Sequence, residues 1–291
     1  MDKKKKRLII DLILLAVVAV GWIYLSRDYP ELRIPKWGDY SSSAPAEPSG
    51  GSPYKYYYDT LSNVQKHAYN MILDEIYDMP SKIEIPKITS DDLTTVFESL
   101  LFDNPDMFFV NRECEVVSKL GRMFFIINYS MTQDEYIEKK AELDAKCDEI
   151  ISKIDTSKGD YVTEKAIHDY IVNNTDYTYV SGDTVTSSAY GSLINGLASC
   201  EGYSRAAKYL FDKVGIESST ISGTARNTSG VIMSHMWNVV KIGGKYYHLD
   251  CTWDDPVSSN NKKTLSHAYF NVSEKVLSKD HFNFSIDLNC E

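Results

Sequence analysis

The spacing of hydrophobic and polar residues divides the chain into a mainly helical first part and a later part rich in strands. Helical periodicity covers residues 61–77, 93–101, 132–154 and 163–173 and the segment that begins at Cys200. Patterns typical of strands cover residues 123–129, 218–222, 236–242, 246–252 and 269–272. Helices followed by antiparallel strands predict an α+β fold.

The N-terminal segment has the pattern of a membrane anchor. Residues 8–25 are apolar apart from Asp11, and as a helix they would span about 27 Å, close to the hydrocarbon thickness of a bilayer. The basic residues before this run predict a cytoplasmic N-terminus and an exported remainder. A cleaved signal peptide is the alternative, but no small-x-small cleavage site follows the run, which favours an uncleaved anchor.

The composition of residues 26–53 and the distribution of charge refine this organisation. Ser, Gly, Pro and Ala dominate the end of that segment, which is typical of a flexible linker. Residues 1–7 carry five basic residues and one acidic residue, which leaves −14 for the rest of a chain whose total charge is −10. An acidic body without a basic stripe argues against nucleic acid as a partner.

The five cysteines lie far apart in the sequence, which does not fit a disulfide framework. Because their number is odd, at least one is a free thiol if the domain is exported. The chain contains no Cys-x-x-Cys motif and no His/Cys cluster with zinc-site spacing. We therefore expect no metal and no cofactor.

Cys200 stands at the predicted start of an amphipathic helix. The apolar positions of this helix are Tyr203, Ala207, Leu210 and Val214. Ser199 is the predicted N-cap, and Gly215 is the predicted end. A thiol in the first turn lies near the positive end of the helix dipole, which favours the thiolate, and the backbone N–H groups there can stabilise an oxyanion. This feature alone fits a buried structural cysteine as well as a nucleophile.

A predicted hairpin brings a histidine and a carboxylate together. Gly243 and Gly244 separate two strand patterns and predict a two-residue turn of type I′ or II′. Such a turn places Trp237 opposite Asp250, and because side chains alternate, His235 lies on the same sheet face as both. His235 and Asp250 are then diagonal neighbours, about 5–8 Å apart at Cβ. The carboxylate can orient the imidazole, whose other nitrogen is free to take a proton from a thiol.

Other residues compete for these roles. His248 falls on the same face, opposite Val239, and could act as the base. Asp254 and Asp255 could supply the carboxylate, although they lie past the strand and before Pro256. If His235 and Asp250 have no catalytic role, we expect them to form an ion pair on a solvated strand.

Three motifs resemble the core motifs of transglutaminase-like domains. They are residues 189–204 (AYGSLINGLASCEGYS), 234–239 (SHMWNV) and 246–256 (YYHLDCTWDDP), and they follow the family's order of Cys, His and Asp. The resemblance covers roughly residues 160–285, and such domains are common in exported bacterial proteins. It implies a papain-like core in which the helix bearing Cys200 packs on an antiparallel sheet bearing His235 and Asp250. It also implies acyl transfer through a thioester on Cys200.

The same resemblance suggests roles around this triad. The backbone N–H of Cys200 would be one oxyanion donor, and Tyr190 is a candidate for the second. Trp237 and Trp253 are expected to shape the cleft or the core. No segment resembles a calcium-binding loop, so the calcium dependence of animal transglutaminases is not carried over.

The fold leaves the reaction open. An amine that resolves the thioester would give cross-linking, whereas water would give proteolysis or deamidation. The alternative from another class is a non-catalytic binding or scaffolding module at the cell surface. For an exported, anchored domain, we expect peptide or protein substrates, such as cell-wall peptides. The expected parts are a cytoplasmic segment 1–7, a transmembrane anchor 8–25, a linker 26–53, a mainly helical lead-in region 54–155 and a transglutaminase-like domain 156–291.

Overall fold

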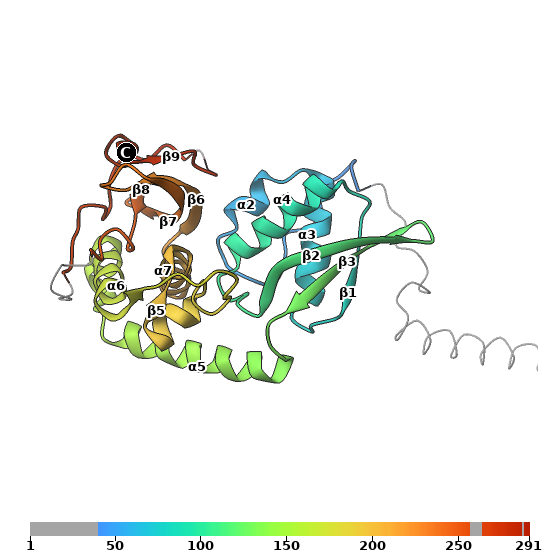
Figure 1. Ribbon diagram of the computed structural model, residues 1–291, viewed down its shortest axis with the longest axis horizontal. Coiled ribbons are helices and arrows are strands. Elements are labelled where there is room, and N and C mark those ends of the chain that lie inside the picture. The colour runs from blue at the N-terminus through green and yellow to red at the C-terminus, as the bar shows by residue number, and fades with distance from the viewer. Residues whose placement is uncertain (1–39, 257–263, 287) are drawn as a thin grey trace, which may run out of the picture.

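The computed structural model describes residues 40–256, 264–286 and 288–291 (Figure 1). The predicted cytoplasmic segment, the predicted anchor and residues 26–39 of the predicted linker lie outside these ranges. Within the described ranges, no helix combines the length and the apolar character needed to cross a membrane.

The lead-in region contains four helices and three strands. In chain order these are α2 (Tyr56–Thr60), α3 (Asn63–Ile76), β1 (Lys82–Ile85), α4 (Ser90–Asp103), β2 (Val110–Lys119), β3 (Arg122–Tyr129) and α5 (Gln133–Ser152). The strands form an antiparallel sheet in the order β1-β3-β2. Of these strands, only β3 was predicted from the sequence, at residues 123–129. Strand β2 lacks the alternation that marks a strand because most of its side chains are exposed on both faces.

The second part of the chain has helices first and then an antiparallel sheet. Its elements are η2 (Thr156–Lys158), α6 (Asp160–Asn174), β4 (Asp176–Tyr177), η3 (Gly191–Asn195), β5 (Leu197–Ala198), α7 (Cys200–Val214), β6 (Ser218–Arg226), β7 (Ile232–Ile242), β8 (Lys245–Leu249), α8 (Glu274–Leu277) and β9 (His281–Phe282). The four-stranded sheet has the order β8-β7-β6-β9, and α7 packs against β6 and β7 (Figure 1). The predicted α+β order is confirmed, with one short parallel pair, β4 and β5, added.

The lead-in region and the second part share one hydrophobic core. A single cluster of buried side chains contains Tyr58 and Phe125 from the lead-in region and Leu210 and Val240 from the second part. Helix α5 packs against α7 and η3 and crosses beneath both parts in Figure 1. The lead-in region is therefore packed onto the domain that follows it.

The end of the predicted linker is not a free tether. Residues 40–53 contain no helix or strand, as expected, but Ser52 is buried. Its hydroxyl donates to Asp212, 2.7 Å away on α7, and accepts from the buried Lys208 at 3.0 Å. The prediction of flexibility is wrong for this residue because a buried ammonium and a carboxylate on α7 need polar partners, which Ser52 supplies.

Candidate active site

Helix α7 places Cys200 at its first residue. Ser199 is the N-cap, and Gly215 ends the helix in the left-handed conformation with φ 76°, as the sequence predicted. Position 202, two residues after Cys200, requires glycine because a Cβ there would lie 2.5 Å from the carbonyl oxygen of Thr186. This close approach fixes the first turn of α7 against the preceding loop and leaves Cys200 half-buried.

The predicted hairpin is present with the predicted register. Gly243 and Gly244 both have positive φ, 59° and 82°, which is the requirement of a type I′ turn. Strands β7 and β8 pair from Ile242 and Lys245 onward, and the ladder ends one residue before Asp250. Asp250 directly follows β8, and its carboxylate reaches His235 of β7.

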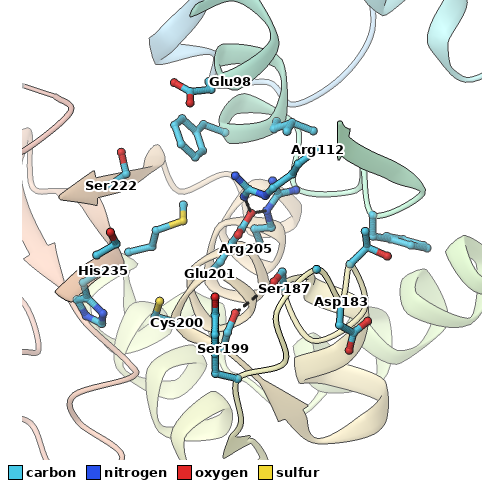
Figure 2. Close-up of a pocket in the computed structure, with 18 of the residues that line it drawn as sticks. Glu98, Arg112, Asp183, Ser187, Ser199, Cys200, Glu201, Arg205, Ser222 and His235 are labelled. Atoms are coloured by element: carbon cyan, nitrogen blue, oxygen red, sulfur yellow. Dashed lines mark hydrogen bonds and ion pairs between the residues drawn. The ribbon is translucent and has the colours of Figure 1, made fainter. Parts of the chain in front are cut away.

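His235 and Asp250 form a buried pair. Nε2 of His235 lies 2.6 Å from Oδ2 of Asp250, and the two side chains are 4% and 0% exposed. The other ring nitrogen, Nδ1, is therefore the one available to Cys200, which lies close enough to contribute to the raised pKa of the imidazole. Figure 2 shows Cys200 and His235 on the same side of the cavity described below.

Electrostatics favour the charged form of both members of this pair. Burial acts to lower the pKa of His235, but the charge and hydrogen bond of Asp250, with a contribution from Cys200, outweigh it and raise the pKa to about 10. Burial acts to raise the pKa of Asp250, but His235 and then His281 hold it well below its usual range. An imidazolium held against a carboxylate is the arrangement that stabilises a neighbouring thiolate.

Cys200 and His235 line a cavity of about 850 Å³. One wall comes from the lead-in region, through Glu98 and Phe102 of α4 and the segment 107–113. The other walls are the loop around residues 179–187, the first turns of α7, and β6 and β7. The lead-in region thus forms a side of the cleft and leaves the thiol facing the open volume (Figure 2).

A comparison with protein families identifies the part of the chain that carries this geometry. The model of the transglutaminase-like superfamily matches residues 148–251, a segment that contains Cys200, His235 and Asp250. Over these residues the chain is similar to the transglutaminase-like superfamily. No curated protein is matched by the sequence.

Solved structures are similar to the chain at low sequence identity, 12–17%. A transglutaminase structure is 17% identical with a TM-score of 0.35 and covers 65% of this chain and 54% of its own. A proposed cysteine protease from Cytophaga hutchinsonii is 17% identical, with a TM-score of 0.31 and coverage of 48% and 61%. A proposed protease from Parabacteroides distasonis is 12% identical, with a TM-score of 0.28 and coverage of 48% and 35%. The chain therefore spans about half the length of the first of these proteins.

A second histidine contacts Asp250, and the sequence pattern did not indicate it. Nε2 of His281, on β9, lies 3.1 Å from Oδ2 of Asp250, and its Nδ1 lies 2.7 Å from Asp280. The other oxygen of Asp250 accepts from the backbone N–H groups of Thr252 and Trp253 at 2.9 and 3.1 Å. Strand β9 is two residues long and distant in sequence, so hydrophobic periodicity gave no signal for His281.

His281 is expected to act as a positioning residue. Replacing it with alanine removes one of the two imidazoles that hold Oδ2 of Asp250 and should allow the carboxylate to rotate. We expect about a tenfold fall in the rate of Cys200 alkylation at neutral pH, with a profile that shifts toward an ordinary thiol. His281→Gln keeps an N–H donor and should recover most of the rate. An unchanged pH profile in His281→Ala would assign His281 to packing alone.

The residues that competed for the triad have other partners. His248 pairs with Val239 as predicted, but its Nδ1 accepts from Nε1 of Trp237 at 3.1 Å, and burial and then His281 lower its pKa to about 4. Asp254 lies 3.1 Å from His168. Asp255 accepts from the hydroxyl of Tyr203 at 2.6 Å. The geometry therefore separates Asp250 from its two rivals.

The tryptophans surround His235, whereas Tyr190 lies elsewhere. The ring of Trp237 stacks on His235 at 5.9 Å, and Trp253 lies 5.6 Å from it. Tyr190 donates its hydroxyl to Glu142 of α5 at 2.5 Å and packs on Phe108. It is not among the residues that line the cavity, so the expectation of an oxyanion role for Tyr190 is corrected. Its partner Glu142 belongs to the lead-in region, and the motif around Cys200 does not indicate which residue of that region Tyr190 contacts.

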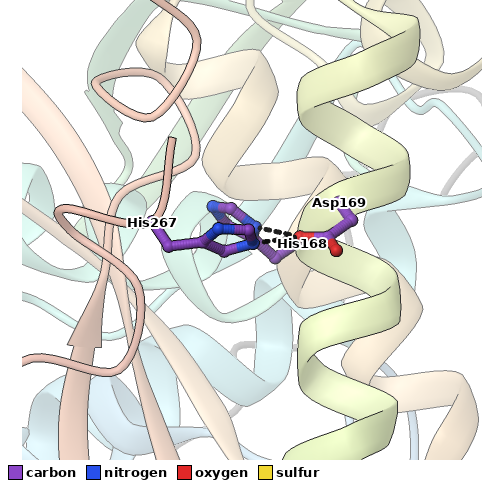
Figure 3. A group of neighbouring side chains, drawn as sticks. All are labelled: His168, Asp169 and His267. Atoms are coloured by element: carbon purple, nitrogen blue, oxygen red, sulfur yellow. Dashed lines mark hydrogen bonds and ion pairs between the residues drawn. The ribbon is translucent and has the colours of Figure 1, made fainter. Parts of the chain in front are cut away.

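Two groups in the described residues bring histidine and carboxylate atoms within 4.8 Å of one another, close enough to hold a metal ion. One is His235, Asp250 and His281, whose ring nitrogens are engaged in the hydrogen bonds given above. The other contains His168, Asp169 and His267 (Figure 3).

Proposed function

We propose that this protein is a thiol-dependent acyltransferase that acts on carboxamide or peptide bonds through a thioester on Cys200. The observation that carries the proposal is the placement of Cys200 at the N-terminus of α7, in one cavity with an imidazole whose Nε2 is held by Asp250. This is the arrangement of an activated nucleophile, its base and the group that orients the base.

The first half of the reaction forms the thioester. Nδ1 of His235 takes the proton of the Cys200 thiol, and Sγ attacks the carbonyl carbon of the substrate. The negative charge that develops on the carbonyl oxygen faces the first turn of α7, where the backbone N–H of Cys200 can donate. The C–N bond then breaks, and the leaving amine or ammonia takes the proton from His235. Asp250 stabilises the imidazolium throughout.

The second half resolves the thioester. His235 accepts a proton from the attacking amine or water, a new bond forms to the carbonyl carbon, and the C–S bond breaks. The proton then returns to the sulfur. An amine gives an isopeptide bond, and water gives a carboxylic acid, so one site supports cross-linking, deamidation or proteolysis.

The polar side chains beside Cys200 favour a polypeptide as the substrate. Beside Cys200, Glu201 accepts from Nε of Arg205 at 2.9 Å and is also paired with Arg112. The side chain of Arg112 is 51% exposed, so its remaining N–H groups can donate to the carbonyl oxygens of a bound segment. We further propose that residues 8–25 anchor the protein in the cell membrane with the C-terminal domain outside, so that cell-wall peptides and surface proteins are the nearest substrates.

The proposal is tested with a glutamine-containing protein such as casein and a fluorescent primary amine. We expect amine incorporation, ammonia release or peptide cleavage from the wild-type protein, and none of these from Cys200→Ala. The ratio of incorporated amine to released ammonia separates cross-linking from hydrolysis. Cys147→Ala is the matched control, since Cys147 is a buried thiol on α5 outside the cavity. Binding of casein without turnover, equal in wild type and Cys200→Ala, would instead favour the non-catalytic module.

A further inference from the structure

A second cluster of chemically active side chains lies outside the cleft, between α6 and the chain at residue 267. His168 and Asp169 are neighbours on α6, and His267 approaches them from the segment before β9 (Figure 3). Oδ1 of Asp169 lies 2.9 Å from Nδ1 of His168 and 2.7 Å from Nε2 of His267. One carboxylate oxygen therefore faces two imidazole nitrogens.

The proton on His168 is assigned by a buried carboxylate. Nε2 of His168 lies 3.1 Å from Oδ2 of Asp254, and both side chains are fully buried. Asp254 also accepts from the backbone N–H of Tyr269 at 3.1 and 3.2 Å, so it is held as an acceptor. Nε2 of His168 must then be the donor. Nδ1 of His168 then faces Oδ1 of Asp169, on the side of the ring away from Asp254.

His267 faces a carboxylate and an ammonium at the same ring nitrogen. Its Nε2 lies 2.7 Å from Asp169 and 2.9 Å from the ammonium of Lys165. If Nε2 carries a proton for Asp169, an N–H faces the ammonium. If Nε2 accepts from Lys165, a lone pair faces the carboxylate. The three side chains thus direct two ring nitrogens and a carboxylate oxygen at one point, where a cation is favoured.

We propose that His168, Asp169 and His267 bind a divalent metal ion, with Zn²⁺ as the preferred ion. Two imidazole nitrogens and a carboxylate oxygen are zinc ligands, and water would complete a tetrahedral set. Around zinc, bonds of about 2.0–2.1 Å place ligand atoms about 3.3 Å apart, so these three atoms need to separate by about half an ångström. The half-exposed His267 and Asp169 provide the route of entry.

The surroundings of His168 support this assignment independently. Histidines that bind metal usually donate their second ring nitrogen to a carboxylate, which fixes the tautomer and the ring orientation. Asp254 does this for His168 from full burial. The sequence gave no zinc signal because the ligands are distant, with Asp169 and His267 separated by 98 positions.

The ammonium of Lys165 would compete with a metal ion for Asp169 and His267. Its ammonium lies 2.5 Å from Oδ2 of Asp169 as well as 2.9 Å from His267. The Lys165 side chain is 42% exposed, so it can turn into solvent when a metal ion takes its place. Removal of its charge should therefore strengthen metal binding, which is the opposite of what loss of an ordinary stabilising ion pair would do.

A metal ion at this site would stabilise the turn that follows Asp250. The backbone N–H of Asp254 donates to the carbonyl of Asp250 at 3.1 Å, and the adjacent Trp253 donates to its carboxylate. A metal ion on His168 would hold Asp254 and thereby this turn, and would join α6 to residue 267. The metal site stands apart from the acyl-transfer proposal, and either can hold without the other.

The test is calorimetric titration of Zn²⁺ into the full chain after removal of metals with a chelator. We expect one ion per chain, binding weakened more than about 100-fold in His267→Ala, and binding strengthened at least about fivefold in Lys165→Met. X-ray absorption at the zinc edge should show only nitrogen and oxygen ligands at about 2.0 Å, with no sulfur at about 2.3 Å. Circular dichroism checks that His267→Ala is folded.

Three results would overturn the site. The first is the absence of zinc binding in both the wild type and Lys165→Met, a variant that removes no ligand. The second is wild-type affinity in His267→Ala, which would place the ion elsewhere, including the group around Asp250. The third is a sulfur ligand in the absorption spectrum, which would assign the zinc to one of the five cysteines.

Discussion

Replacing His235 with alanine is expected to lower acyl transfer about a thousandfold or more, because the variant has no group to take the proton of Cys200 or return it to the leaving amine. The same change should alter the pH dependence of alkylation by iodoacetamide. In the wild type the rate should already be high at pH 7 and change little up to pH 9. In His235→Ala it should rise about tenfold per pH unit over the lower part of that range, as for an ordinary thiol.

The alkaline side of the wild-type profile follows from His235 itself. Burial acts against its protonation, but Asp250 and Cys200 raise its pKa to about 10. Turnover needs the imidazolium as the acid, so it should fall as pH rises through about 10. Because the pKa is raised on folding, the stability that the charged pair contributes is fully present below about pH 6.5 and is lost as pH rises toward 10. Denaturant titrations at pH 6.5, 8.5 and 10 measure this loss.

His67→Ala is the matched control for these measurements, since His67 is half-buried and its ring contacts the carbonyl of Ser43, away from the cavity. Its alkylation profile and its turnover should equal those of the wild type. Alkylation of Cys200 that follows the same ordinary-thiol profile in the wild type, His67→Ala and His235→Ala would remove the activated pair and with it the proposed chemistry.

Asp250→Asn should reduce turnover by about a thousandfold and also destabilise the fold. The amide cannot accept from two imidazoles at one oxygen and two backbone N–H groups at the other, as the carboxylate does. Loss of one partner in a buried charged pair costs about 3–5 kcal/mol of unfolding free energy. Because folding lowers the pKa of Asp250, this stability is present above about pH 4 and is lost as pH falls through the depressed value.

The measurement is chemical denaturation at pH 7 combined with the alkylation profile. Asp255→Asn is the matched control, because Asp255 is a buried carboxylate of the same turn that accepts from Tyr203. It should lose stability while Cys200 keeps its wild-type reactivity. If Asp250→Asn loses stability but alkylates like the wild type, Asp250 is a structural residue and another group orients His235.

Local chemistry made much of the site predictable. The Gly243-Gly244 turn fixed the register of β7 and β8, and the helical period from Cys200 with Ser199 before it located α7. The positions of the triad followed from these two elements. The family match extends over 148–251, which contains the first two motifs and the part of the third that includes Asp250, but ends before the expected limit near residue 285.

The remaining features depend on long-range contacts that leave no periodic trace. The partner of Tyr190 is Glu142 on α5, the partner of Ser52 is Asp212, and His281 reaches Asp250 from a two-residue strand. Each contact joins segments that are at least 31 positions apart. Strands β1 and β2 were missed for a related reason, since neither combines sufficient length with alternating burial.

The shared core has a consequence for how the enzyme could be regulated. A zymogen is activated when a protease removes a propeptide that blocks the cleft. Here the lead-in region lines the cleft, and its Tyr58 and Phe125 are part of the same buried cluster as Leu210 of α7. Cleavage between α5 and α6 followed by release of the lead-in region would expose that cluster to water and unfold the nucleophile's helix. We therefore expect removal of this segment to destabilise the fold rather than to uncover a finished site.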